Sequence, residues 1–231
     1  MNMSTWINHP IFGIALSIMA YTGAQYIHQR WRWLHPLFTC SGFIIVILLS
    51  FHIPYEAYQK GADILTLLLG PATVALGVPL YKNAALIKKH ITGILVSVIV
   101  GSIASIATAA ALVAFLGGSR EIMLSMLPKS VSSPIAIEIS RQLGGLPELT
   151  AVLTVLTGLF GSMFGVKLLK LVGLKDDLSI GISIGTAAHG IGTARLIKDS
   201  ETQGSLSGFA MGAAGIITSL LFIPIYWWFA N

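Results

Sequence analysis

Residues 127–138 read Leu127-Pro128-Lys129-Ser130-Val131-Ser132-Ser133-Pro134-Ile135-Ala136-Ile137-Glu138 in the middle of an apolar run. A serine followed by proline is typical of a helix start, because serine caps free N–H groups and proline fits the first helical position. Gly144-Gly145 then supplies a stop. The stretch predicts a short half-helix, capped by Ser133, whose positive amino end lies inside an apolar segment.

The composition identifies the solvent of the chain. Hydrophobic residues make up 55% of the 231 residues and charged residues only 10%, whereas a soluble domain carries roughly 25% charged residues. The net charge of +5 falls between apolar runs, which indicates membrane orientation and lipid headgroups rather than nucleic acid. The one cysteine, Cys40, excludes an intrachain disulfide. We predict a polytopic protein of the lipid bilayer.

The apolar runs set the expected architecture. A spanning helix needs roughly 20 apolar residues, and the chain has room for about seven or eight such segments with short loops. The runs lie at 11–27, 37–53, 62–81, 91–116, 122–143, 149–171, 178–196 and 206–229. No linker or low-complexity tract separates them. We therefore predict an all-α membrane protein with broken or re-entrant helices and a single domain over 1–231.

The basic loops leave the path of one segment open. Lysine and arginine gather at 30–32, 82–89 and 167–175, and such loops are typical of the cytoplasmic side. Eight full crossings would put the last of these loops outside. Segment 122–143 is the candidate for a segment that enters and leaves on one side, because it has prolines at its centre; whether it does so or crosses stays open.

A re-entrant segment would make the two halves of the chain run in opposite directions. Gly70 and Gly77 fall on Gly185 and Gly192 at one constant offset, which indicates an internal duplication, with chance matches in a glycine-rich chain as the alternative. Inverted repeats with interrupted helices are typical of secondary transporters with a site at the midplane.

Three interrupted stretches supply the candidate site residues. The first, at 69–81, holds Thr73 and the helix-breaking residues Gly70, Pro71, Gly77 and Pro79. A proline-kinked packing helix is its alternative interpretation. The second is the half-helix stretch, broken at Pro128 and Pro134. The third, at 185–195, holds His189 and Thr193 among the glycines Gly185, Gly190 and Gly192. A lone histidine is also a common structural donor, so both roles of His189 stay open.

The half-helix stretch predicts a site for an anion. Free N–H groups, the hydroxyls of Ser130, Ser132 and Ser133, and the Lys129 ammonium converge there, and together they would hold a carboxylate. Alternatively, Lys129 snorkels to an interface and the serines bond the backbone.

Glu138 and Arg141 stand three residues apart and face each other on one helix turn. They are either a structural pair or a coupling group, since an ionisable residue in a membrane segment is a functional candidate.

Enzyme signatures are absent from the sequence. It has no G-x-S-x-G elbow, no phosphate-binding G-x-x-x-x-G-K-[ST] loop and no H-E-x-x-H pair. One cysteine offers no metal framework. We expect neither enzymatic activity nor a cofactor or metal.

The three stretches resemble the LrgB family, also called CidB/LrgB. The resemblance covers essentially the whole chain and rests on Gly70-Pro71-Ala72-Thr73-Val74-Ala75 with Pro79-Leu80-Tyr81-Lys82, on residues 127–136, and on Gly185-Thr186-Ala187-Ala188-His189-Gly190-Ile191-Gly192-Thr193-Ala194. The departures are Ser132 and Ser133 where threonines are usual, and Gly77 where alanine is frequent.

The resemblance implies a multi-pass protein of the bacterial inner membrane that works beside a small membrane partner, LrgA or CidA. It implies two functions. One is holin/antiholin-like control of murein hydrolase activity and autolysis. The other is transport of small carboxylates, since the plastid glycolate/glycerate transporter is similar to a fusion of the two partners, and some bacterial relatives are described as pyruvate facilitators.

The residues favour transport over regulation, because a holin-like pore needs no buried half-helix ends with hydroxyls and a lysine. A glycolate-, glycerate-, pyruvate- or lactate-like substrate would bind between the broken segments and move by alternating access. Lys129 and the three serines would hold its carboxylate, while Thr73, His189 and Thr193 would contact its hydroxyl or oxo group. We also expect a homo-oligomer, a dimer being favoured.

Overall fold

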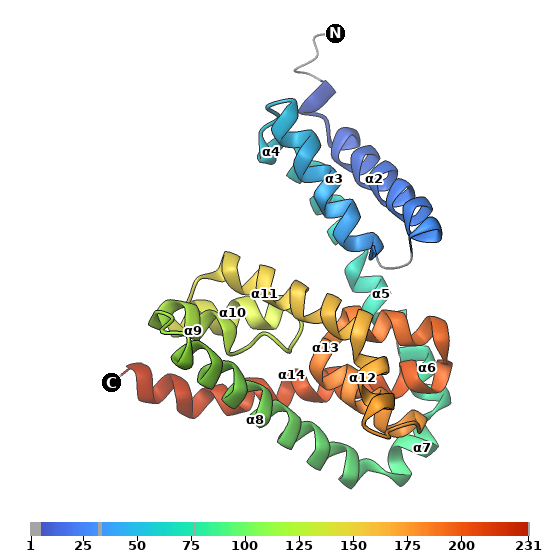
Figure 1. The fold of residues 1–231 in the computed structure, drawn as a ribbon, viewed down its shortest axis with the longest axis vertical. Helices are drawn as coiled ribbons and strands as arrows, with labels where there is room; N and C mark the ends of the chain where they lie inside the picture. Colours follow the sequence, from blue (N-terminus) through green and yellow to red (C-terminus); the bar gives the residue numbers. More distant parts are fainter. Residues whose placement is uncertain (1–5, 32–33, 76, 231) are drawn as a thin grey trace. The chain divides into compact units, whose positions relative to one another are not determined.

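The computed structural model describes residues 6–31, 34–75 and 77–230, apart from the side chains at 69, 72, 73 and 228–230. This part of the chain consists of helices joined by short turns (Figure 1). The chain divides into two compact units, Met1–Ala75 and Leu76–Asn231. Their boundary falls inside the first interrupted stretch. The two units are defined by how their residues pack, so the single domain over 1–231 stays a prediction.

The first unit consists of α2 (Pro10–Arg30), α3 (Pro36–Ser50), α4 (Tyr55–Thr66) and α5 (Leu69–Ala75). Helices α2 and α3 both begin with a histidine–proline pair, in which the histidine Nδ1 accepts the N–H two residues ahead at 3.3 Å. Helix α2 packs closely on α4, because Gly13 and Gly61 allow their backbones to touch. The hydroxyls of Ser17 and Tyr58, 2.9 Å apart, join the same two helices.

The second unit holds the remaining helices. They are α6 (Gly77–Lys82), α7 (Ala84–Lys89), α8 (Ile91–Phe115), α9 (Arg120–Met126), α10 (Ser133–Leu143), α11 (Pro147–Phe160), the π-helical turn η1 (Gly161–Gly165), α12 (Val166–Leu171), α13 (Asp177–Asp199) and α14 (Glu201–Ala230). Helices α11, η1 and α12 follow one another without a break.

Four stretches among the described residues are long and apolar enough to cross a membrane. They are Pro10–Arg30, Ile91–Phe115, Pro147–Leu171 and Glu201–Trp227. Helix α3 is a shorter apolar helix. These helices confirm the predicted class, a helical polytopic membrane protein. The runs at 62–81 and 122–143 are each divided among shorter helices.

The second of these divided runs is a helical hairpin. Helix α9 has 7 residues and α10 has 11, so α10 is about 16 Å long and far shorter than the roughly 30 Å hydrocarbon core. After α10 the chain returns to α9, where the Leu146 N–H donates to the Ser125 hydroxyl at 2.7 Å. The segment therefore turns back on itself, which favours the re-entrant interpretation.

Helix α13 is interrupted at His189, whose φ of 39° and ψ of −138° lie outside the helical region. Two half-helices result, on either side of this residue. Gly185 was expected to contribute to this break, and that expectation is wrong. It lies in the regular first half, where its missing Cβ allows the Ser207 backbone of α14 to come into contact.

Gly190 follows the interruption directly, and Gly192 packs against Ala188 and Ile184. In the first stretch, Gly70 and Pro71 lie within α5, and Gly77 and Pro79 lie within α6. Helix α4 ends at Thr66 and α5 begins at Leu69, so this interruption precedes Gly70 and Pro71. Residue 76, between α5 and α6, lies outside the described residues, and the breaks at Gly77 and Pro79 stay predictions.

Candidate functional site

A layer of hydroxyl groups lies between two apolar clusters of the second unit. The first cluster includes Val98 of α8 and Ala214 of α14. The second includes Ala109 of α8 and Phe222 of α14. Between these levels α8 carries Ser102 and Ser105 near the middle of its 25 residues. The layer therefore lies close to the middle of a spanning helix, at the depth where transporter sites are found.

Lys129 reaches into this layer from the turn between α9 and α10. Its ammonium donates to the Ser105 hydroxyl at 3.1 Å and to the Ser130 hydroxyl at 3.3 Å. The two hydroxyls lie 2.6 Å apart and bond each other. Pro128 beside Lys129 is fully buried, so the turn is held firmly. The structure thus brings the predicted residues Lys129 and Ser130 together with a hydroxyl of α8.

The charge of Lys129 has only neutral partners here. No carboxylate among the described residues lies within ion-pair distance of its Nζ, and the three ion pairs found there join other residues. Lys129 is partly buried, and cations withdrawn from water are normally paired, since an unpaired charge in a low dielectric is costly. The arrangement is suited to an anion that arrives from outside the protein.

Helix α10 begins beside this turn. Its N-cap is Ser132, so the prediction of Ser133 as the cap is wrong by one residue: Ser133 is the first helical residue and Pro134 follows it. The Ser132 side chain makes no capping bond, and neither serine hydroxyl bonds another described group. The helix ends at Gly144 with a φ of 84°, as the glycine pair predicted. The first turn of α10 therefore keeps free donors.

His189 and Thr193 form a second hydrogen-bonded group on α13. The His189 Nε2–H donates to the Thr154 carbonyl of α11 at 2.9 Å. The Thr193 hydroxyl donates to the His189 carbonyl at 2.8 Å, and it therefore accepts from the Ser207 hydroxyl, also at 2.8 Å. Both side chains are buried. These bonds fix the interruption against α11 and α14, and no hydrogen bond joins this group to Lys129.

Thr73 lies in α5 of the first unit. Its side chain is outside the described residues, so its assignment to the substrate stays a prediction. The groups around Lys129 and His189 are built from the second unit alone.

Glu138 and Arg141 pair as the spacing predicts, with the Arg141 Nη1 2.7 Å from the Glu138 Oε2, and both side chains are more than half exposed. Glu138 also accepts from the Gln142 amide at 3.0 Å. Exposure of both partners is typical of a surface ion pair. Whether the pair is structural or couples transport stays open.

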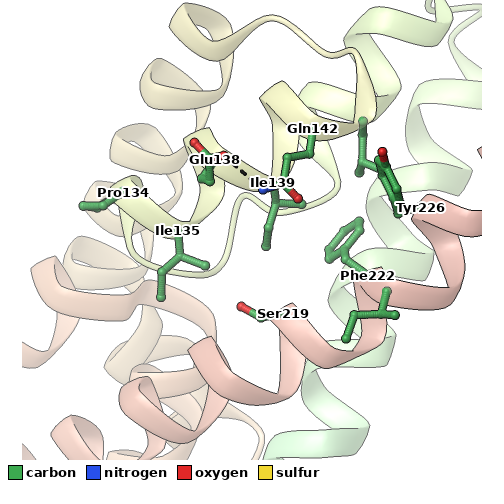
Figure 2. Close-up of a pocket in the computed structure, with 10 residues that line it drawn as sticks. Pro134, Ile135, Glu138, Ile139, Gln142, Ser219, Phe222 and Tyr226 are labelled. Carbon is green, nitrogen blue, oxygen red and sulfur yellow. Dashed lines mark hydrogen bonds between the residues drawn. The ribbon is translucent and has the colours of Figure 1, made fainter. Parts of the chain in front are cut away.

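An open pocket of about 480 Å³ lies between α10 and α14 (Figure 2). Its lining is Pro134, Ile135, Glu138, Ile139, Gln142, Leu143, Ser219, Phe222, Ile223 and Tyr226. Figure 2 shows Glu138 and Gln142 of α10 on one side and Phe222 and Tyr226 of α14 on the other. Because a carboxylate is its charged group, this pocket is ill suited to an anion, and Lys129 does not line it.

Ser102 and Ser105 are the site residues that the sequence did not single out. The sequence shows 91–116 only as an uninterrupted apolar run, and serines in such a helix commonly bond their own backbone. The available signal was their spacing: two serines three residues apart share one helix face, at the centre of a long apolar run.

Comparison with known proteins addresses the identity of the chain. Residues 17–228 match the LrgB-like family. The chain belongs to this family.

Its relatives match over nearly their full length. The uncharacterized protein YwbG of Bacillus subtilis is 34% identical over 90% of this chain and 93% of its own. An uncharacterized protein of Haemophilus influenzae is 37% identical over 89% and 90%. The holin-like protein CidB of Staphylococcus epidermidis is 32% identical over 92% and 93%. No solved structure was found to match the chain. With its apolar helices, this LrgB-like chain is a multi-pass membrane protein.

Proposed function

We propose that this LrgB-like protein transports small carboxylates of the glycolate, glycerate, pyruvate or lactate kind by alternating access. The observation that carries the proposal is the Lys129 ammonium, which lies near mid-span and is held by the neutral hydroxyls of Ser105 and Ser130. An ionisable group inside a membrane segment is a functional candidate by default. A carboxylate from solution would complete its coordination.

The surroundings of Lys129 support an anion of small size. Uncapped N–H groups at the start of α10 add partial positive charge, as helix N-termini do at anion sites. Apolar clusters close the hydroxyl layer on both sides along α8 and α14. A short carboxylate fits such a layer better than a long-chain or multiply charged one, because each additional polar group would need its own partner.

The interrupted helices support alternating access. The turn before α10 and the break at His189 both place non-helical backbone within the second unit, and such breaks occur in membranes where backbone is buried or lines a cavity. Movement of these elements past the remaining helices would open the site to each side in turn.

Regulation of murein hydrolases is the second candidate function. It is favoured by the printed name of the CidB relatives, holin-like protein. We propose the bacterial inner membrane as the location of the chain and an LrgA/CidA-type protein as its partner under either function.

Uptake of labelled glycolate, pyruvate and lactate into proteoliposomes tests the transport proposal, with and without the small partner protein. Saturable uptake of at least one acid supports it. Absence of flux for every carboxylate, with the partner present, overturns it. Regulation instead predicts altered autolysis after deletion, which an unrelated carboxylate carrier would not rescue.

A further inference from the structure

Ser102 is a buried hydroxyl without a hydrogen-bond partner. Its side chain is 4% exposed, and among the described residues its Oγ is the buried side-chain polar atom that lacks a partner. Buried hydroxyls are normally bonded, since the loss of water is otherwise uncompensated. Other buried helical hydroxyls of this chain meet the rule by donating to the carbonyl four residues back, as Thr154, Thr186 and Thr193 do. Ser102 makes no such bond.

The position of Ser102 links it to the Lys129 group. Ser102 and Ser105 are three residues apart on α8, so their Cβ atoms are neighbours at about 5–6 Å on one helix face. Ser105 is bonded to Lys129 and Ser130. The adjacent Gly101 faces Thr186 of α13, since a Cβ built on it would lie 3.1 Å from the Thr186 Cγ2. Ser102 is buried and thus lies on a face of α8 that points into the unit, one helix turn from the hydroxyl to which Lys129 donates.

The hydrogen-bonding groups of this cluster leave three donors unused. The ammonium has three N–H groups and donates two of them to Ser105 and Ser130. Those two hydroxyls share one mutual bond, so the proton of one of them stays free. The Ser102 O–H is the third donor. Three donors grouped around one positive charge suit a ligand that offers three acceptor oxygens.

We propose that Ser102 is a specificity-determining residue, which binds the 2-oxygen of a 2-hydroxy or 2-oxo acid whose carboxylate is held by Lys129, Ser105 and Ser130. This inference rests on the proposed function. Such acids carry two carboxylate oxygens and a neighbouring 2-oxygen, which matches the three donors. Because a hydroxyl can donate or accept, Ser102 serves a 2-hydroxyl and a 2-oxo group equally.

Two of the three residues expected to contact the 2-oxygen are already engaged, and the side chain of the third, Thr73, lies outside the described residues. His189 uses its Nε2–H on the Thr154 carbonyl, and the Thr193 hydroxyl both donates and accepts within the protein. Recruiting the His189 Nε2–H or the Thr193 hydroxyl as a donor would break bonds that fix the interrupted helix. Ser102 is available without such a loss, so α8 rather than α13 supplies the specificity.

Ligand binding to the purified full-length protein tests the inference separately from flux. The melting temperature is titrated with lactate and with propionate, two acids of equal chain length that differ in the 2-hydroxyl. The variants are Ser102→Ala and, as matched control, Ser97→Ala, which removes an exposed hydroxyl from the same helix. Uptake into proteoliposomes is measured in parallel.

Wild-type protein and Ser97→Ala should bind lactate about three- to tenfold more tightly than propionate, because this ratio of affinities corresponds to the usual net free energy of one hydrogen bond. Ser102→Ala should bind propionate as wild type does and lose the preference for lactate. Equal affinities in wild type, or a preference that survives Ser102→Ala, would overturn this inference while carboxylate binding and transport stand. Absence of both binding and uptake for all the acids would overturn the proposed function as well.

Discussion

The Lys129 ammonium lies 3.1 Å from the Ser105 hydroxyl, and this contact joins the turn between α9 and α10 to the middle of α8, a helix long and apolar enough to span a membrane. A lysine that snorkelled to an interface would direct its charge toward headgroups. Lys129 instead directs it at the hydroxyls of Ser105 and Ser130, which are partly or fully buried. The contact therefore makes α8 part of the candidate site and ties the position of the cation to a helix that crosses the membrane.

Removal of the Ser105 hydroxyl, the partner of Lys129 on α8, should lower carboxylate uptake without unfolding the protein. We expect Ser105→Ala to lower carboxylate uptake about tenfold, because Lys129 loses one of two hydroxyls that orient it and the substrate loses a donor. Thr108→Ala is the control, since Thr108 is exposed on the same helix and bonds only its own backbone. Equal uptake by the two variants would exclude Ser105 from the site.

Close packing at His189 should make Gly158 intolerant of a side chain. A Cβ on Gly158 would lie 2.7 Å from the His189 Cε1 and Nε2, so Gly158→Ala should displace the ring from the Thr154 carbonyl. We expect a loss of about 1–3 kcal/mol, the usual cost of overpacking. Gly212→Ala, on the open side of α14, should leave stability unchanged or raise it by about 0.5–1 kcal/mol. Thermal unfolding in detergent measures both, and similar melting temperatures would refute the packing role.

Glu138 should be dispensable for transport. Its carboxylate is exposed and bonded to Arg141 and Gln142 on its own helix, and exposed pairs contribute little. We expect Glu138→Gln to keep uptake within about twofold of wild type, with and without an imposed pH gradient. A coupling role predicts the opposite: the variant would lose the response to the gradient.

The start of α13 should be sensitive to acid. The Ser179 N–H donates to Asp176 at 2.8 Å, and this bond holds the pKa of the Asp176 carboxyl below its ordinary value of 3.8. A lowered pKa means that the cap stabilises the fold above pH 3.8 and that this contribution disappears as the pH falls through the folded-state value.

Asp176→Ala should therefore cost about 1 kcal/mol at neutral pH, as N-caps do. Asp176→Ser keeps a cap that does not ionise, so it should retain most of the stability and flatten the dependence on pH below 3.8. Melting temperatures between pH 3 and 7 measure this. Parallel curves for wild type and Asp176→Ser would contradict it.

The sequence predicted much of the fold because lipid imposes simple rules. The long apolar run at 91–116 became the single helix α8, and the run at 206–229 lies in the single helix α14, which continues across Pro224. Pro128, Pro134 and Gly144 marked the half-helix, since backbone chemistry alone determines where a helix can start and stop. The glycine-rich stretch at 185–195 was harder to interpret. Gly185 does not interrupt the helix; it allows the contact with Ser207, and only the tertiary packing reveals this role.

The sequence also predicted part of the candidate site, because polar groups inside apolar runs are easy to recognise. Lys129 stood out because a charge inside an apolar run is conspicuous. His189 and Thr193 also stood out, yet their partners are backbone and side-chain groups of α11 and α14, and such long-range bonds leave no local pattern. Ser102 and Ser105 were overlooked because serines in a spanning helix usually bond their own backbone.

Uptake by Lys129→Ala tests the central claim most directly, namely that the Lys129 ammonium holds a transported carboxylate. The variant is compared in proteoliposomes with wild type and with Lys167→Ala, which removes an exposed lysine. We predict that Lys129→Ala folds, because no ion pair among the described residues depends on it. Its carboxylate uptake should fall on the order of 100-fold, while Lys167→Ala retains wild-type uptake. Wild-type uptake by a folded Lys129→Ala protein would contradict the account.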